Sequence, residues 1–242
     1  MKENKKPKKT ESPHGGHRER MRNRFLKGGL DAFADHEIIE MLLYYGIPRQ
    51  NTNEIAHKVY REFGSLHELF DATPQQIMHR TGMTENSAVL FSIVPHLFKR
   101  YSYGKWDKKI VFNSSKELGE YAKIPFIGKN YECFYMLCFN NNFELKGLEM
   151  LEEGTLDAVE LHPRKVVDLA LINRSSYVVL AHNHPSGCKM VSLADLHATT
   201  SIMKLLEPFN IELIDHIIIA GEDYISFAEN NHAQLAGIRG KK

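Results

Sequence analysis

The chain has 242 residues, of which 43% are hydrophobic, and its formal net charge is +1. This length suits one large or two small domains with packed cores, and no apolar run approaches the roughly 20 residues of a membrane-spanning helix. Three irregularly spaced cysteines and a lysine-rich N-terminus without an apolar segment favour a cytoplasmic protein with reduced thiols and no membrane partner.

The first residues are strongly basic. Residues 1–24 hold nine Lys and Arg against three Asp and Glu, whereas residues 25–105 hold eight against nine. Because this start contains almost nothing apolar, we expect residues 1–22 to form a disordered basic tail. A tail of this kind binds phosphate backbones weakly and without sequence preference, so it predicts weak, non-specific DNA binding, with a solubility-promoting tail as the alternative.

Residues 23–102 are predicted to form a helical domain, with helices at 37–45, 53–63, 74–80 and 84–101 that begin and end at typical capping residues. Between the last two helices, Thr81-Gly82-Met83-Thr84 resembles the turn of a helix-hairpin-helix. Such a turn uses two glycines to present backbone N–H groups to a DNA phosphate. Here Thr84 replaces the second glycine, and it can cap the following helix instead.

A linker at 101–109 is expected to separate this domain from a domain of mixed elements at 108–231. The patterns there predict helices at 115–122, 163–171 and 193–206, and strands at 133–139, 145–150, 177–181, 211–220 and 224–227. Residues 152–155, Glu-Glu-Gly-Thr, are typical of a turn between strands. The expected fold class is α/β (α+β), an all-helical domain followed by a mixed sheet with helices.

A candidate metal site follows the predicted strand at 177–181. His182 and His184 are two residues apart, so on an extended chain they face the same way, and Asp195 can return as a third ligand after a Pro-Gly loop. Two imidazoles and one carboxylate leave a tetrahedral position open for water, which is typical of a catalytic Zn²⁺ site. Ser192 and Asp195 also fit a helix N-cap with an acidic first turn, so Ser192 has two possible roles.

The full spacing is His-x-His, seven residues, Ser, two residues, Asp, and it resembles the site of JAMM (MPN-type) metallopeptidases. Flanking segments such as Val159-x-x-His162-Pro163-Arg164 and Leu213-Ile-Asp-His216-Ile are similar to the RadC-like branch, of the UPF0758 type, from about Arg18 to Glu229. The resemblance implies a JAMM/MPN-type (cytidine-deaminase-like) domain behind a helix-hairpin-helix-like region.

The resemblance also implies an activity. In that superfamily a glutamate on a strand before the ligands is the general base, and the matching position is Glu132, with Glu149, Glu152 and Glu153 as competitors. Glu132 would take a proton from the water that zinc activates, and Ser192 would stabilise the oxyanion. The implied reaction is hydrolysis of an amide or isopeptide bond in a peptide-type substrate. Asn183 departs from the Ser or Thr that peptidase members often carry between the histidines.

A second hypothesis remains open at this point: a non-enzymatic, DNA-associated or scaffolding protein that keeps the metal for structure. The two hypotheses differ in Glu132 and in the open zinc position, because an enzyme needs both and a structural site needs neither.

Overall fold

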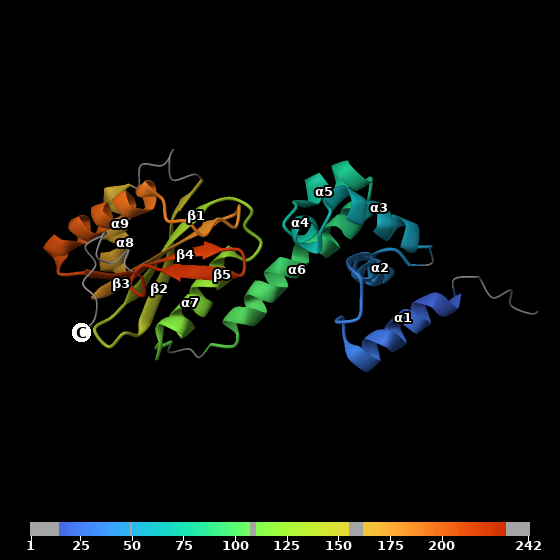
Figure 1. Cartoon of the computed structure of the whole chain (residues 1–242), viewed down its shortest axis with the longest axis horizontal. Coiled ribbons are helices and arrows are strands. Elements are labelled where there is room, and N and C mark those ends of the chain that lie inside the picture. The colour runs from blue at the N-terminus through green and yellow to red at the C-terminus, as the bar shows by residue number, and fades with distance from the viewer. Residues whose placement is uncertain (1–14, 49, 107–109, 155–161, 231–242) are drawn as a thin grey trace, which may run out of the picture. The chain divides into compact units, whose positions relative to one another are not determined.

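The computed structural model describes residues 15–48, 50–106, 110–154 and 162–230. It divides the chain into two compact units, the first ending at Pro95 and the second beginning at His96. The predicted fold class is confirmed, since the described residues of the N-terminal part form helices and a five-stranded mixed sheet with helices follows (Figure 1).

In the first unit, capping residues end one helix and begin the next. Gly64 adopts a left-handed conformation with φ of 78° and ends one helix, and Ser65 caps the next by accepting a hydrogen bond from the Glu68 N–H. Ile39, Leu43 and Phe91 are fully buried in its core. The described helices are α1 (Gly15–Gly28), α2 (Asp35–Gly46), α3 (Asn53–Phe63), α4 (Leu66–Phe70), α5 (Pro74–Thr81) and α6 (Glu85–Tyr103), of which α6 continues beyond Pro95.

Two of these helices change the predicted boundaries. Helix α1 covers residues 15–22, which the sequence assigned to the basic tail, and residues 1–14 of that tail lie outside the described residues. In α1, Arg18 donates to the Ile47 carbonyl at 3.0 Å, and Arg24 pairs with Glu37 at 2.5 Å. Helix α6 runs through Pro95 to Tyr103, so it takes the first residues of the predicted linker.

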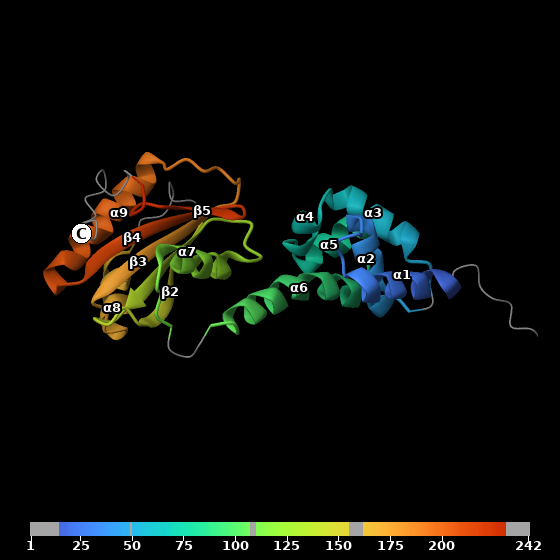
Figure 2. The same cartoon turned by 60° about the horizontal axis from the view of Figure 1, so that its bottom comes forward.

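The described residues of the second unit form a sheet with the strand order β2-β1-β3-β4-β5. Figure 2 shows β3, β4 and β5 lying side by side. Neighbouring strands are antiparallel except β3 and β4, which are parallel and are joined through α9. One face packs against α8 and α9, and the other packs against α7. The bounds are α7 (Ser115–Lys123), β1 (Cys133–Phe139), β2 (Leu145–Glu153), α8 (Pro163–Ile172), β3 (Tyr177–His184), α9 (Leu193–Leu206), β4 (Glu212–Ala220) and β5 (Asp223–Ser226).

Two strands are longer than predicted, and both differences concern the site. Strand β2 continues through Glu153, which pairs with Cys133, so the predicted turn at Glu152–Glu153 is wrong. Gly154 comes after the strand with φ of 122°, and Thr155 lies outside the described residues. Strand β3 continues through His184 rather than ending at residue 181 because it keeps pairing with β4 up to Ala220.

A helix that crosses a membrane must be both long and apolar. Among residues 15–48, 50–106, 110–154 and 162–230, no helix is long and apolar enough to do so.

Candidate metal centre

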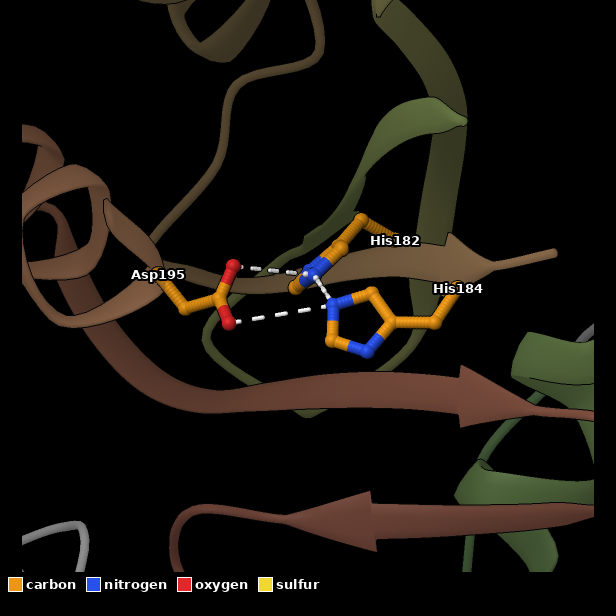
Figure 3. A group of neighbouring side chains, drawn as sticks. All are labelled: His182, His184 and Asp195. Atoms are coloured by element: carbon orange, nitrogen blue, oxygen red, sulfur yellow. Dashed lines mark hydrogen bonds and ion pairs between the residues drawn. The ribbon is translucent and has the colours of Figure 1, made fainter. Parts of the chain in front are cut away.

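The end of β3 and the start of α9 bring three ligand-type side chains together. His182 and His184 alternate with Asn183 along β3 and therefore share one face of the sheet. Asp195 lies in the first turn of α9 and points at both rings (Figure 3). One ligand atom from each of the three residues lies within 4.8 Å of the others. The structure thus brings together the three residues that the spacing singled out.

The ligand-type atoms lie within 3.8 Å of the Nε2 atom of His182 or His184. His182 Nε2 lies 2.9 Å from His184 Nε2 and 3.1 Å from Asp195 Oδ1. His184 Nε2 lies 3.8 Å from the other carboxylate oxygen, Oδ2. Among the described residues, the buried Oδ1 of Asp195 has no hydrogen-bond partner. A buried acceptor without a donor is costly, so this donor set fits a metal ion.

Helix capping orients Asp195. Its Oδ2 accepts a hydrogen bond from the Ser192 N–H at 2.7 Å, and its own N–H donates to Ser192 Oγ at 3.1 Å, which together form a capping box. Burial raises the pKa of Asp195, but the contacts with His182 and Ser192 outweigh it and hold that pKa well below its usual range. Asp195 is therefore an anion, which is the form that binds metal.

The Nδ1 atom of each imidazole makes a further hydrogen bond. Burial lowers the pKa of His182 despite the opposing charge of Asp195, so the neutral ring is favoured. His182 Nδ1 lies 2.8 Å from His216 Nε2 on β4, and His184 Nδ1 donates to the Cys188 carbonyl at 2.8 Å. His216 is fully buried, and the sequence reasoning gave it no role at the site. A lone histidine inside the apolar run of β4 was the signal that could have found it.

Glu132 lies directly before β1 and is partly exposed. Phe134 pairs with His182 in the antiparallel register, so two residues earlier Glu132 stands opposite His184 and, by alternation, on the same face. Burial lowers the pKa of His182 below its ordinary value, and the charges of Asp195 and Glu132 oppose this shift. The structure therefore places a carboxylate at the edge of the metal centre.

Two of the three competing glutamates bind other side chains, and all three lie on β2, which is not adjacent to β3. Glu149 accepts a hydrogen bond from Asn173 Nδ2 at 2.9 Å, and Glu153 pairs with Lys129 at 2.9 Å. Glu152 belongs to β2, which β1 separates from β3, and it pairs with Phe134. Position in the sheet thus favours Glu132 over all three.

Asn183 connects β3 to the backbone on both sides of Glu132. Its Oδ1 accepts a hydrogen bond from the Cys133 N–H at 2.7 Å, and its Nδ2 donates to the Tyr131 carbonyl at 3.0 Å. Asn183 is buried and lies on the opposite face of β3 from the histidines. The residue that departs from the peptidase pattern therefore fixes the chain segment that carries the candidate base.

Ser192 is exposed at the rim of the site. Its oxygen accepts the hydrogen bond from the Asp195 N–H, and its hydroxyl also interacts with the Asp195 carboxylate and lowers the pKa of that group. The serine therefore caps α9, and its one hydrogen would have to turn from Asp195 to a bound group for Ser192 to donate to that group.

Comparisons with known proteins agree with this architecture. Residues 112–232 match the family described as the RadC-like JAB domain, and residues 15–89 match the family described as UPF0758 N-terminal. A UPF0758 protein of Pseudoalteromonas translucida is 32% identical over 211 residues, which cover 87% of this chain and 94% of the relative. A UPF0758 protein of Fusobacterium nucleatum is 34% identical over 227 residues, covering 91% and 98%. Their names describe a family and state no activity.

Proposed function

We propose that this chain, which belongs to the UPF0758 family and carries a RadC-like JAB domain, is a zinc-dependent hydrolase of amide or isopeptide bonds. The observation that supports this most is the geometry at the end of β3. Two Nε2 atoms and a buried carboxylate oxygen without a hydrogen-bond partner, among the described residues, converge there. Glu132 is near enough for its charge to raise the pKa of His182. Family membership alone is compatible with a hydrolase and does not name a reaction.

His182, His184 and Asp195 would hold the ion. Imidazole nitrogen and carboxylate oxygen are ligands that suit Zn²⁺. In the described part of the chain the ligand group contains these three residues, whereas structural zinc sites nearly always use four protein ligands. This count favours an enzyme over the alternative of a structural metal in a scaffolding or DNA-associated protein. When bound, zinc supplies a Lewis acid and lowers the pKa of a water to about 7.

The residues of the chain supply the proton transfers. Glu132 accepts a proton from the attacking water, whose oxygen bonds to the substrate carbonyl carbon. Ser192 donates a hydrogen bond to the carbonyl oxygen as negative charge develops there. When the C–N bond breaks, Glu132 returns the proton to the leaving nitrogen, so the products are a carboxylic acid and an amine.

The test compares wild type with Glu132→Gln, which keeps the size of the side chain and removes its basicity. Both proteins, loaded with zinc, are assayed against a panel of peptides and lysine-linked isopeptides. We expect equal zinc content and a loss of turnover of about 100-fold or more in the variant, since general bases contribute roughly 10²–10⁴. Glu149→Gln is the matched control, because Glu149 is bound to Asn173, and it should hydrolyse as wild type does.

Each outcome decides something different. Unchanged turnover in Glu132→Gln would move the base to another residue. Wild-type protein that binds zinc and hydrolyses nothing in the panel would favour the structural-metal alternative, and wild-type protein that binds no metal would refute the proposal.

A further inference from the structure

We infer that Thr199 and His216 set the tautomer of His182, so that its Nε2 presents a lone pair to the metal centre before any ion binds. The inference rests on the proposed function only in treating His182 as a ligand. It makes Thr199 and His216 positioning residues, because each acts on the centre through the next residue in a chain of hydrogen bonds.

The chain of hydrogen bonds starts at the Thr199 hydroxyl, which can only accept from His216 because its own hydrogen is already used. Thr199 Oγ1 donates to the Asp195 backbone carbonyl, one helical turn earlier in α9, at 2.5 Å. A hydroxyl has one hydrogen, and this bond uses it. Any further hydrogen bond at Thr199 Oγ1 must therefore bring its own hydrogen.

His216 supplies that hydrogen. Its Nδ1 lies 2.6 Å from Thr199 Oγ1, so Nδ1–H is the donor. His216 is fully buried against the rings of Phe134 and Phe227. Among the described residues, its side-chain hydrogen bonds go to Thr199 and His182 and to no carboxylate, which favours the uncharged ring with a single N–H. Because that hydrogen is on Nδ1, Nε2 of His216 is an acceptor.

The accepting Nε2 of His216 then determines which nitrogen of His182 carries the hydrogen. His182 Nδ1 lies 2.8 Å from His216 Nε2, and since the latter only accepts, His182 Nδ1–H is the donor. The uncharged His182 ring is then left with a bare Nε2. His184 carries a hydrogen on Nδ1 for a separate reason, because its Nδ1 faces the Cys188 carbonyl, which has no hydrogen to give.

When both rings are uncharged, three electron-rich atoms therefore face one another. They are Nε2 of His182, Nε2 of His184 and Oδ1 of Asp195, with separations of 2.9 Å between the nitrogens and 3.1 Å from His182 to the oxygen. Lone pairs at these distances repel, and a cation relieves the repulsion. The buried chain thus prepares the centre for a metal, and breaking it lets His182 move its hydrogen to Nε2, from which metal must displace it.

The test uses a matched pair of substitutions in the full chain. Thr199→Val keeps the shape and removes the oxygen that accepts from His216, whereas Thr199→Ser keeps the hydroxyl. Zinc affinity is measured by competition with a chromogenic chelator. We expect Thr199→Val to bind zinc about 10–100-fold more weakly, the usual effect of losing an outer-shell partner, and Thr199→Ser to bind as wild type does. Equal affinity in all three proteins would overturn the inference.

A second measurement requires no metal. In chelator-treated, ¹⁵N-histidine-labelled protein, two-bond ¹H–¹⁵N correlation spectra distinguish Nδ1–H from Nε2–H rings, and His182→Asn and His216→Asn spectra assign the signals. We expect Nδ1–H for both residues in wild type, and Nε2–H for His182 in wild type would refute the inference. If wild type bound no zinc, the proposed function would fail while these spectra still decided the tautomer.

Discussion

Replacing Asn183 by Ala should destabilise the second unit and impair hydrolysis without removing the metal. The substitution deletes the acceptor of the Cys133 N–H and the donor to the Tyr131 carbonyl. Both backbone groups flank Glu132, and Cys133 is buried. The segment that carries the candidate base would then lose its attachment to β3, while the ligand face of β3 keeps its side chains.

The structure gives the size of the effect. A buried N–H left without a partner costs about 1–3 kcal/mol, and losing the second hydrogen bond costs roughly 1 kcal/mol. The sum, about 2–4 kcal/mol, corresponds to a fall in Tm of roughly 4–16 °C for a unit of about 150 residues. Because Glu132 is positioned only if its backbone is held, turnover should fall by about 100-fold, as for removal of a general base.

Calorimetry, zinc content and turnover on the same preparation would test this prediction. Asn173→Ala is the matched control, since Asn173 also makes two side-chain hydrogen bonds, to Glu149 and to the Leu169 carbonyl, but does not touch the segment around Glu132. It should lose stability and keep its turnover per folded molecule. An unchanged Tm in Asn183→Ala, or an equal loss of turnover in both variants, would refute the reasoning.

Three further predictions concern the metal ligands, Asp215 and the basic tail. Elemental analysis should find about one zinc per chain, and His184→Ala should lose it while the N-terminal helices stay folded; equal zinc in both proteins would contradict the ligand assignment. Burial raises the pKa of Asp215 to about 6 from 3.8 despite its hydrogen bond from Ser226, so its contribution to folding is full below pH 4 and is lost as pH rises through 6. In metal-free protein, the unfolding free energy of Asp215→Asn should therefore gain about 3 kcal/mol on wild type between pH 4 and 7, and parallel urea-denaturation profiles would refute this. If DNA binding depends on the basic tail, deleting residues 1–14 should abolish a salt-sensitive mobility shift that ignores sequence, whereas a persistent shift would point to the hairpin.

The DNA experiment differs from what the sequence alone would suggest. Composition placed the basic tail across residues 1–22, but Met21 is buried, and Arg18 and Arg24 bind the Ile47 carbonyl and Glu37. Removing residues 1–24 would take away a packed helix together with the charge. Deleting residues 1–14 keeps α1 and still removes Lys2, Lys5, Lys6, Lys8 and Lys9.

Local patterns predicted the parts of the site that depend on local geometry. Strand alternation puts His182 and His184 on one face, and the Ser-x-x-Asp pattern starts α9 at Ser192. The contacts of Asn183 and His216 could not be predicted in this way, because they depend on which residues of β1 and β4 stand beside β3. Strand register is set by the packing of whole faces against α7, α8 and α9, and no single segment of the sequence contains it.

Asp195 shows why folding and metal binding are difficult to separate here. One carboxylate oxygen, Oδ2, accepts the Ser192 N–H and so helps to start α9, and the other, Oδ1, is thereby turned into the centre without a hydrogen-bond partner among the described residues. The helix start thus orients the ligand before a metal arrives. Ser192 is subject to the same coupling, since Ser192→Ala removes both the candidate oxyanion donor and a cap worth about 1 kcal/mol. A fall in turnover in that variant is evidence for an oxyanion role only if zinc affinity, which reports the orientation of Asp195, stays unchanged.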